Sequence, residues 1–121
     1  SSWVAGTEEF QFYFGGDTGY CGDVFRSIRE CCGSMDLSAI PIAAYGVPAE
    51  AWFHKPNHMN PEESVKCHMD LESRQSVAIH WGTFTLTGEH VGHKFQIITY
   101  QNLKYFHKFI VFFTIFSCLI V

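Results

Sequence analysis

Apolar and polar residues alternate in short runs at the start of the chain, a pattern typical of β-strands. Ser2–Val4 and Glu9–Phe14 are predicted to form the two strands of a hairpin, with Ala5–Thr7 as its turn. The second strand stops at Gly15 and Gly16, where the backbone freedom of glycine permits a sharp change of direction. We therefore expect the chain to leave this strand abruptly.

The next segment has the spacing of an amphipathic helix. Asp23 is predicted to cap a helix that runs to about Cys32 and stops at Gly33. The apolar face of this helix is expected to contain Val24, Phe25 and Ile28. Cysteines on helix faces are usually buried. We therefore expect buried thiols at Cys31, Cys32 and Cys67.

A second helix has a complete start signature. Asn60 is predicted to be its N-cap, and Pro61 occupies the first helical position. Glu62 and Glu63 then fall in the first turn, where negative charge complements the helix dipole. We expect this role for the two glutamates rather than paired acid–base chemistry.

Two further apolar runs predict strands. Asp36–Tyr45 suits a strand that is buried on both faces, although Pro41 limits its length. Gln75–Ile79 predicts another short strand. Two of the predicted strands are thus followed by a residue that can bind a metal, Asp17 or His80. Ligands gather in layered α/β folds where strand ends open into loops, so we expect the functional site there.

Composition excludes several classes of protein. The chain has 121 residues, a formal net charge of −4 and no basic stripe, so we expect no nucleic-acid partner. Its 5 cysteines are an odd number without a C-x-x-C pair, which argues against a disulfide scaffold and favours a reducing compartment. The first residues lack both an initiator Met and a signal-peptide pattern. A missing upstream part is therefore expected.

The composition changes from about Val91. Residues 91–121 contain no Asp, Glu or Pro and are rich in Phe, Ile, Lys, Tyr and Asn, whose codons are rich in A and T. The last apolar run, residues 109–121, is shorter than the roughly 20 residues of a membrane-spanning helix. We predict one partial domain over residues 1–90. The remainder is interpreted as a divergent tail, either a translated intron or a membrane-associating segment, and a single membrane span by this tail is less favoured.

Four stretches, taken in order, resemble one known family. They read "GGDTGYC", "DLSAIPIAAY", "NHMNPEESVKCHMD" and "SVAIHWGTFTLTGEH". Over about residues 8–90 the chain is similar to the C-terminal part of the N-acylphosphatidylethanolamine-hydrolysing phospholipases D, within the metallo-β-lactamase superfamily. The resemblance implies an α/β layered fold, half of an αββα sandwich with a two-zinc site at one edge of its sheets.

The resemblance also implies roles for individual residues. Asp17 corresponds to the aspartate that bridges both zinc ions, and His80 corresponds to a ligand of one of them. His58 corresponds to a histidine near the substrate phosphate, and Asn57 stands beside it where the family has glutamine. Thr85 corresponds to a position near a bile-acid site. A bridging carboxylate must be ionised and desolvated, and zinc ions compensate for that cost.

Part of the family pattern is absent from this sequence. The family has a His-x-His-x-Asp-His cluster and a further histidine upstream of Gly-Asp-Thr-Gly, and no such cluster occurs here. A catalytic zinc ion normally takes three protein ligands. Asp17 and His80 alone therefore cannot hold two zinc ions, and we expect this chain by itself to be inactive.

The resemblance implies that the complete protein hydrolyses N-acylphosphatidylethanolamine to an N-acylethanolamine and phosphatidic acid. Its phospholipid substrate implies an intracellular protein that is peripheral on membranes, and the family allows a homodimer. Two alternatives stay open. One is another metallo-β-lactamase-fold hydrolase that acts on a phosphodiester or a lactone, and the other is a non-catalytic, membrane-associated remnant.

Overall fold

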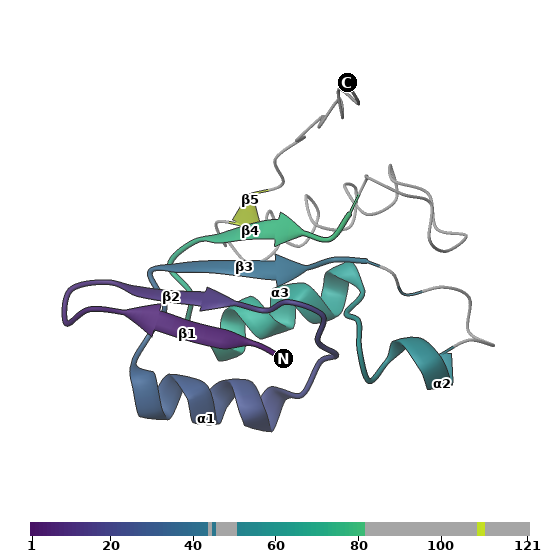
Figure 1. The fold of residues 1–121 in the computed structure, drawn as a ribbon, viewed down its shortest axis with the longest axis horizontal. Helices are drawn as coiled ribbons and strands as arrows, with labels where there is room; N and C mark the ends of the chain where they lie inside the picture. The colour runs from purple at the N-terminus through teal and green to yellow at the C-terminus, as the bar shows by residue number, and fades with distance from the viewer. Residues whose placement is uncertain (44, 46–50, 82–108, 111–121) are drawn as a thin grey trace, which may run out of the picture.

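The computed structural model describes residues 1–43, 45, 51–81 and 109–110 (Figure 1). Its elements in chain order are β1 (Trp3–Gly6), β2 (Gln11–Phe14), α1 (Gly22–Cys32), β3 (Leu37–Pro41), α2 (Ala51–His54), α3 (Pro61–Asp70), β4 (Ser76–Ile79) and β5 (Phe109–Ile110). α1, β3, α3 and β4 follow the hairpin in the predicted order, and the short helix α2 between β3 and α3 was not predicted.

The strands form one sheet in the order β1-β2-β3-β4-β5. β1 is antiparallel to β2, whereas the pairs β2–β3, β3–β4 and β4–β5 are parallel. The carboxyl ends of β2, β3 and β4 consequently meet at the same edge of the sheet (Figure 1). This edge is where a site is expected in a layered α/β fold.

The predicted hairpin is confirmed, with different strand bounds. β1 pairs with β2 from Trp3↔Phe14 to Gly6↔Gln11, so the first strand continues as far as Gly6, into the predicted turn. The loop is closed by the Thr7 backbone N–H, which donates to the Phe10 carbonyl at 2.8 Å.

The central strand is buried on both faces, as its continuous apolar run predicts. All four residues from Ser38 to Pro41 are buried between β2 and β4. The strand ends at Pro41 rather than Tyr45, because proline has no N–H to donate to a neighbouring strand. Ile42 nevertheless continues the pairing for one residue, since its N–H donates to the Ile79 carbonyl at 3.2 Å.

The start of α1 corrects one prediction. The N-cap residue is Cys21, which makes no side-chain cap, and Asp23 lies within the first turn. The Asp23 carboxylate forms an ion pair with Arg26 one turn later, at 2.6 Å, and does not cap the helix. The predicted stop at Gly33 is confirmed, because its φ of 83° is a left-handed conformation that suits glycine.

The burial of α1 corrects two further predictions. Phe25 is buried in the core and Ile28 packs against it, but Val24 is exposed. Cys31 and Cys32 are also exposed, because they lie in the last turn, beyond the residues that contact the core. Cys67 of α3 is buried as expected, and this burial raises its pKa well above the usual value.

The start of α3 is confirmed in detail. The Asn60 side chain accepts a hydrogen bond from the Glu63 backbone N–H at 2.8 Å, and the Glu63 carboxylate accepts one from the Asn60 N–H at 3.0 Å. Pro61 opens the helix. This reciprocal capping box satisfies two backbone donors that a helix start otherwise leaves unpaired.

Helices α1 and α3 pack on one face of the sheet. A single core cluster joins Phe25 of α1 and Val65 of α3 to Tyr13 and Ile40 of the strands. The fold is therefore the expected α/β arrangement, a sheet with helices layered against one of its faces.

Much of the predicted tail lies outside the described residues. Within it, Phe109–Ile110 forms β5, which pairs in parallel with Ser76 and Val77 of β4. In the described part of the chain, no helix has the length and apolar character to cross a membrane. The proposed boundary at residue 90 and the nature of the tail stay predictions.

Candidate functional site

Two predicted metal ligands meet at the carboxyl edge of the sheet. His80 Nδ1 lies 3.1 Å from Asp17 Oδ1, although the residues are far apart in sequence. Asp17 follows β2 and His80 follows β4, so β3 separates the strands that deliver them. Both side chains are substantially exposed, with relative accessibilities of 70% and 38%. An exposed pair of this kind contributes little to stability.

The loop that carries Asp17 leaves β2 through two glycines. The Gly15 N–H donates to the Ala39 carbonyl at 2.8 Å, which keeps the chain on the sheet for one residue beyond β2. Gly16 then adopts a φ of 57°, and a Cβ there would lie 2.7 Å from the Ser1 carbonyl oxygen. Glycine is required at this position by both conformation and space, and the turn directs the next residue toward β4.

His80 itself has a left-handed backbone with a φ of 56°. This conformation costs a non-glycine residue about 1 kcal/mol or more, and such residues concentrate at functional sites. It reverses the chain immediately after β4, so the imidazole lies at the edge where Asp17 is.

The separation of the two side-chain atoms suits two ligands of one metal ion. Two atoms bound to a single tetrahedral zinc ion lie about 3.3 Å apart, given usual ligand distances. Carboxylate oxygen and imidazole nitrogen are both common zinc ligands. Among the described residues, no group of three or more metal-ligating side chains occurs. The pair therefore fits part of a zinc site, and the metal role of both residues stays a prediction.

The connection between α2 and α3 supports the loop that carries Asp17. A Cβ at Gly19 would overlap the Lys55 carbonyl oxygen and come within 2.9 Å of the Pro56 carbonyl carbon. The second glycine of the Gly-Asp-Thr-Gly motif is thus required by close backbone approach. The segment that contains Asn57 and His58 consequently adjoins this loop.

His58 has an environment that is compatible with ligand contact. Its Nδ1 atom is buried and has no hydrogen-bond partner among the described residues. Buried polar atoms are rarely unpaired, so this nitrogen needs an explanation. The ring lies 6.1 Å from the ring of His54, and Asn57 beside it is exposed. A phosphate contact at His58 and Asn57 stays a prediction, and Thr85 lies outside the described residues.

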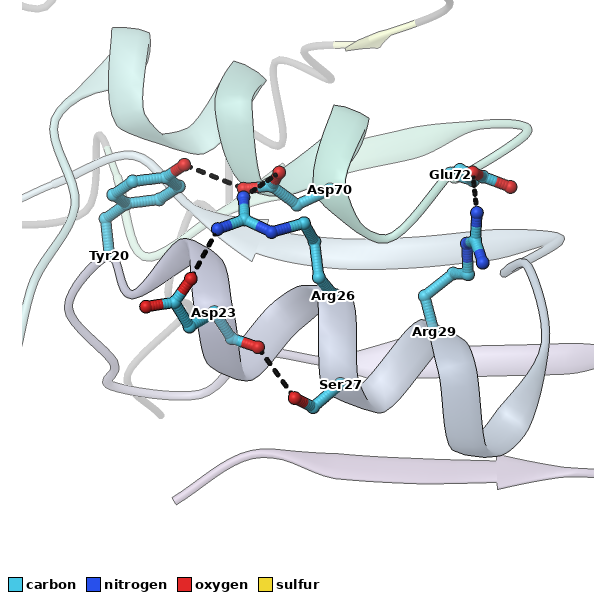
Figure 2. A network of polar contacts seen from close by, with 7 residues as sticks. All are labelled: Tyr20, Asp23, Arg26, Ser27, Arg29, Asp70 and Glu72. Atoms are coloured by element: carbon cyan, nitrogen blue, oxygen red, sulfur yellow. Dashed lines mark hydrogen bonds and ion pairs between the residues drawn. The ribbon is translucent and has the colours of Figure 1, made fainter.

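Sequence reasoning missed a polar network beside this site. The Tyr20 hydroxyl donates to Asp70 at 2.7 Å, and Arg26 also donates to Asp70, at 2.8 Å (Figure 2). Burial, followed by the hydrogen bond to Asp70, raises the pKa of Tyr20 to about 12. One signal was available in the sequence, because an acidic residue in the last turn of a helix opposes the helix dipole and needs another reason to be there.

Comparison with known proteins identifies relatives that share this region. The chain is 45% identical to N-acyl-phosphatidylethanolamine-hydrolyzing phospholipase D 1 of Caenorhabditis elegans over 86 residues, which is 71% of this chain and 23% of that protein. It is 42% identical to the mitochondrial N-acyl-phosphatidylethanolamine-hydrolyzing phospholipase D of Saccharomyces cerevisiae over 79 residues, 64% of this chain and 16% of that protein. An uncharacterized protein of Mycobacterium tuberculosis is 43% identical over 90 residues, 71% of this chain and 22% of that protein. The chain thus spans less than a quarter of these relatives.

A solved structure supports the fold assignment. The CmlA beta-hydroxylase E377D mutant superposes with a TM-score of 0.65 over 92% of this chain and 25% of that one, at 12% sequence identity. This likeness shows the fold alone. The model of the beta-lactamase superfamily domain matches residues 1–81, which include both Asp17 and His80. The chain therefore belongs to the beta-lactamase superfamily.

Proposed function

We propose that the chain forms the C-terminal part of a zinc-dependent phospholipase D. The complete protein would hydrolyse N-acylphosphatidylethanolamine to an N-acylethanolamine and phosphatidic acid. The approach of Asp17 to His80 at the carboxyl edge of the sheet is the observation that carries the proposal. The names of two relatives support the same substrate.

In this proposal, Asp17 and His80 supply part of the metal-binding set. Asp17 would provide carboxylate oxygens that reach two metal ions, and His80 would provide one ring nitrogen. Zinc held in this way lowers the pKa of a bound water and stabilises negative charge on a phosphodiester. The remaining ligands would come from outside the described residues, because a catalytic zinc normally has three protein ligands.

His58 is the residue that we propose for contact with the substrate phosphate. Its buried Nδ1 has no partner among the described residues, and its segment adjoins the loop of Asp17. An imidazole in that position can donate a hydrogen bond to a phosphate oxygen. Asn57 is a second polar group on the same segment and would assist in orienting the headgroup.

Two alternatives to the phospholipase proposal differ from it in substrate or in zinc binding. Another hydrolase of the same fold, acting on a different phosphodiester or on a lactone, would share Asp17 and His80 but not the substrate. The solved neighbour is named a β-hydroxylase, which shows that one fold accommodates different reactions. A non-catalytic, membrane-associated remnant would bind no zinc. A phospholipid partner, a peripheral membrane location and a homodimer all belong to the phospholipase proposal.

The decisive experiment begins with the complete transcript that contains this reading frame. The encoded protein is expressed, its zinc content is measured by mass spectrometry, and release of N-acylethanolamine from vesicles is followed. We expect about two zinc ions per chain and lipid hydrolysis. Zinc-free protein without lipid hydrolysis would overturn the proposal and support the remnant.

Asp17→Asn and His80→Ala test the two ligands in that protein. Each is expected to lower zinc content and to reduce the hydrolysis rate by about 100-fold or more. Asp23→Asn is the matched control, because Asp23 is an exposed carboxylate whose ion pair with Arg26 lies on α1. Equal losses in Asp17→Asn and Asp23→Asn would remove Asp17 from the proposed site.

A further inference from the structure

The loop between β2 and α1 is anchored at both of its ends. At the β2 end, Gly15 is hydrogen bonded to β3. At the α1 end, the Tyr20 hydroxyl donates to Asp70 Oδ2 of α3 at 2.7 Å. Asp17 lies between these anchors, three residues from Tyr20. A fixed position for Tyr20 therefore limits how far the Asp17 side chain can move.

The Tyr20 ring is itself held in place. It packs against the Phe25 ring with a centroid distance of 5.7 Å, and Lys66 Nζ lies 6.0 Å from its centroid. Phe25 is buried in the close-packed core, so the Tyr20 ring packs against a rigid part of the molecule. The hydroxyl is then directed toward α3, where Asp70 accepts its hydrogen bond (Figure 2).

Asp70 is poorly suited to its position unless these contacts hold it. Its side chain is only 16% exposed and stands in the last turn of α3, where the helix dipole disfavours negative charge. Arg26 Nη1 donates to Oδ1 at 2.8 Å, which leaves Oδ2 for Tyr20. A partly buried carboxylate is costly without such partners. Its presence here is explained by the contacts it makes to the loop and to α1.

We propose that the hydrogen bond between Tyr20 and Asp70 holds the loop of Asp17 against His80, which makes Tyr20 and Asp70 positioning residues. This inference rests on the proposed metal role of Asp17, but the contact between Asp17 and His80 can be tested without metal. Loss of the hydroxyl removes the hydrogen bond that ties the α1 end of the loop to α3, while the ring stays on Phe25. The Asp17 carboxylate then samples more positions relative to the imidazole.

The same pair of helices provides a matched control. Arg29 of α1 donates to Glu72, which also accepts a hydrogen bond from Ser34 at 3.1 Å. This contact joins the last turn of α1 to the segment just after α3 and involves no residue of the loop (Figure 2). Glu72→Gln therefore weakens the interface between α1 and the region after α3 without releasing Tyr20.

Tyr20→Phe is compared with Glu72→Gln and the unaltered 121-residue chain. Amide hydrogen exchange of residues 16–19 reports opening of the loop, and the ¹⁵N chemical shift of His80 Nδ1 at fixed pH reports its contact with Asp17. We expect Tyr20→Phe to accelerate exchange about tenfold and to shift the nitrogen signal. Glu72→Gln should leave the exchange rate within about twofold of the parent and should leave the His80 nitrogen signal where it is in the parent.

Unchanged exchange and an unchanged His80 signal in Tyr20→Phe would overturn the inference, as would equal changes in Glu72→Gln. Far-UV circular dichroism establishes that each variant is folded. If Tyr20→Phe does not fold, Asp70→Asn is measured against the same thresholds, because it keeps the size of the side chain and weakens the acceptor. Failure of the parent protein to bind zinc would remove the proposed function but would not alter these metal-free results.

Discussion

The two faces of the sheet carry similar side chains but have different surroundings. Tyr13 and Phe14 are consecutive residues of β2, so their side chains point to opposite faces. Tyr13 is fully buried under the helices, with its ring edge-on to Phe25 at 6.3 Å. Phe14 is 38% exposed, and its cross-strand partner Trp3 is 68% exposed. Apolar character alone therefore does not identify which face a helix layer covers.

The register extends this comparison across the sheet. Phe12 pairs with Leu37, and Ala39 pairs with Val77, so the face opposite the helices is apolar over several strands. An apolar sheet face is normally packed against another layer. The matched relatives are more than four times longer than the aligned region. Ala39 of β3 is already buried, so the exposed part of this face lies on β1 and β2, at Trp3 and Phe14. We expect a further part of a longer protein to cover it, and we expect the chain alone to associate through it.

The largest loss of stability should come from a substitution on the helix-covered face of the sheet. Tyr13→Ala removes a buried ring from the core and is expected to lower the free energy of unfolding by about 3–5 kcal/mol. Urea denaturation, monitored by circular dichroism, measures the loss in the free energy of unfolding. Phe14→Ala is the control on the other face and should cost clearly less. Equal losses would mean that both faces are equally packed.

Alkaline pH should lower the free energy of unfolding through tyrosines on the helix-covered face of the sheet. Burial, with a smaller contribution from Cys67, raises the pKa of Tyr13 to about 12, and burial and Asp70 raise that of Tyr20 to about 12. A pKa above the usual value of 10.0 means that the stabilisation is complete below pH 10 and is lost as pH rises toward 12. We expect the buried Tyr13 to account for a fall of about 2 kcal/mol in the free energy of unfolding.

This pH dependence is measured by urea denaturation at about pH 9 and about pH 12. Tyr20→Phe should retain most of the fall, because Tyr20 is less buried than Tyr13 and solvent screens its interactions. A free energy of unfolding that stays constant over this interval would contradict the burial of Tyr13.

On the opposite face, Trp3→Ser should change the free energy of unfolding by only about 0.5 kcal/mol, because the side chain is mostly exposed. Its principal effect should be on self-association, since it removes the most exposed aromatic ring of β1 and β2. Static light scattering should show a lower mass for the variant at equal concentration. An unchanged mass would place the associating surface elsewhere.

The smallest effect should come from the outer surface of the helix layer. Arg29, with a smaller contribution from Ser34, lowers the pKa of Glu72. The resulting stabilisation is present above the usual pKa of 4.5 and is lost as pH falls through the lowered value. Thermal unfolding of Glu72→Gln should therefore lose a small part of the normal acid sensitivity. A large change in melting temperature near neutral pH would contradict the solvent-screened nature of this pair.

Local sequence signals predicted most of the described fold. The start of α3 follows from Asn60 and Pro61, and the stop of α1 follows from Gly33, because capping depends on neighbouring residues. The meeting of Asp17 with His80 follows from strand ends at one edge of the sheet. These predictions need little knowledge of how helices pack.

The errors arise where tertiary packing decides. Cys31 and Cys32 are helical, but the sequence does not specify where the layer beneath α1 ends, and they are exposed. The bond between Tyr20 and Asp70 joins residues that are 50 positions apart, so it depends on how α1 and α3 lie together. Asp23 found an ion-pair partner in Arg26 and did not act as a cap.

The left-handed backbone at His80 has a consequence for selection. Glycine or asparagine would adopt this conformation with less strain than histidine does. A laboratory evolution experiment that rewards folding alone would therefore drift toward Gly or Asn at position 80. One that also rewards catalysis in the complete protein would retain the histidine and accept a less stable product. If His80 has the proposed metal role, its backbone strain is the cost in stability of keeping a metal-binding side chain at this position.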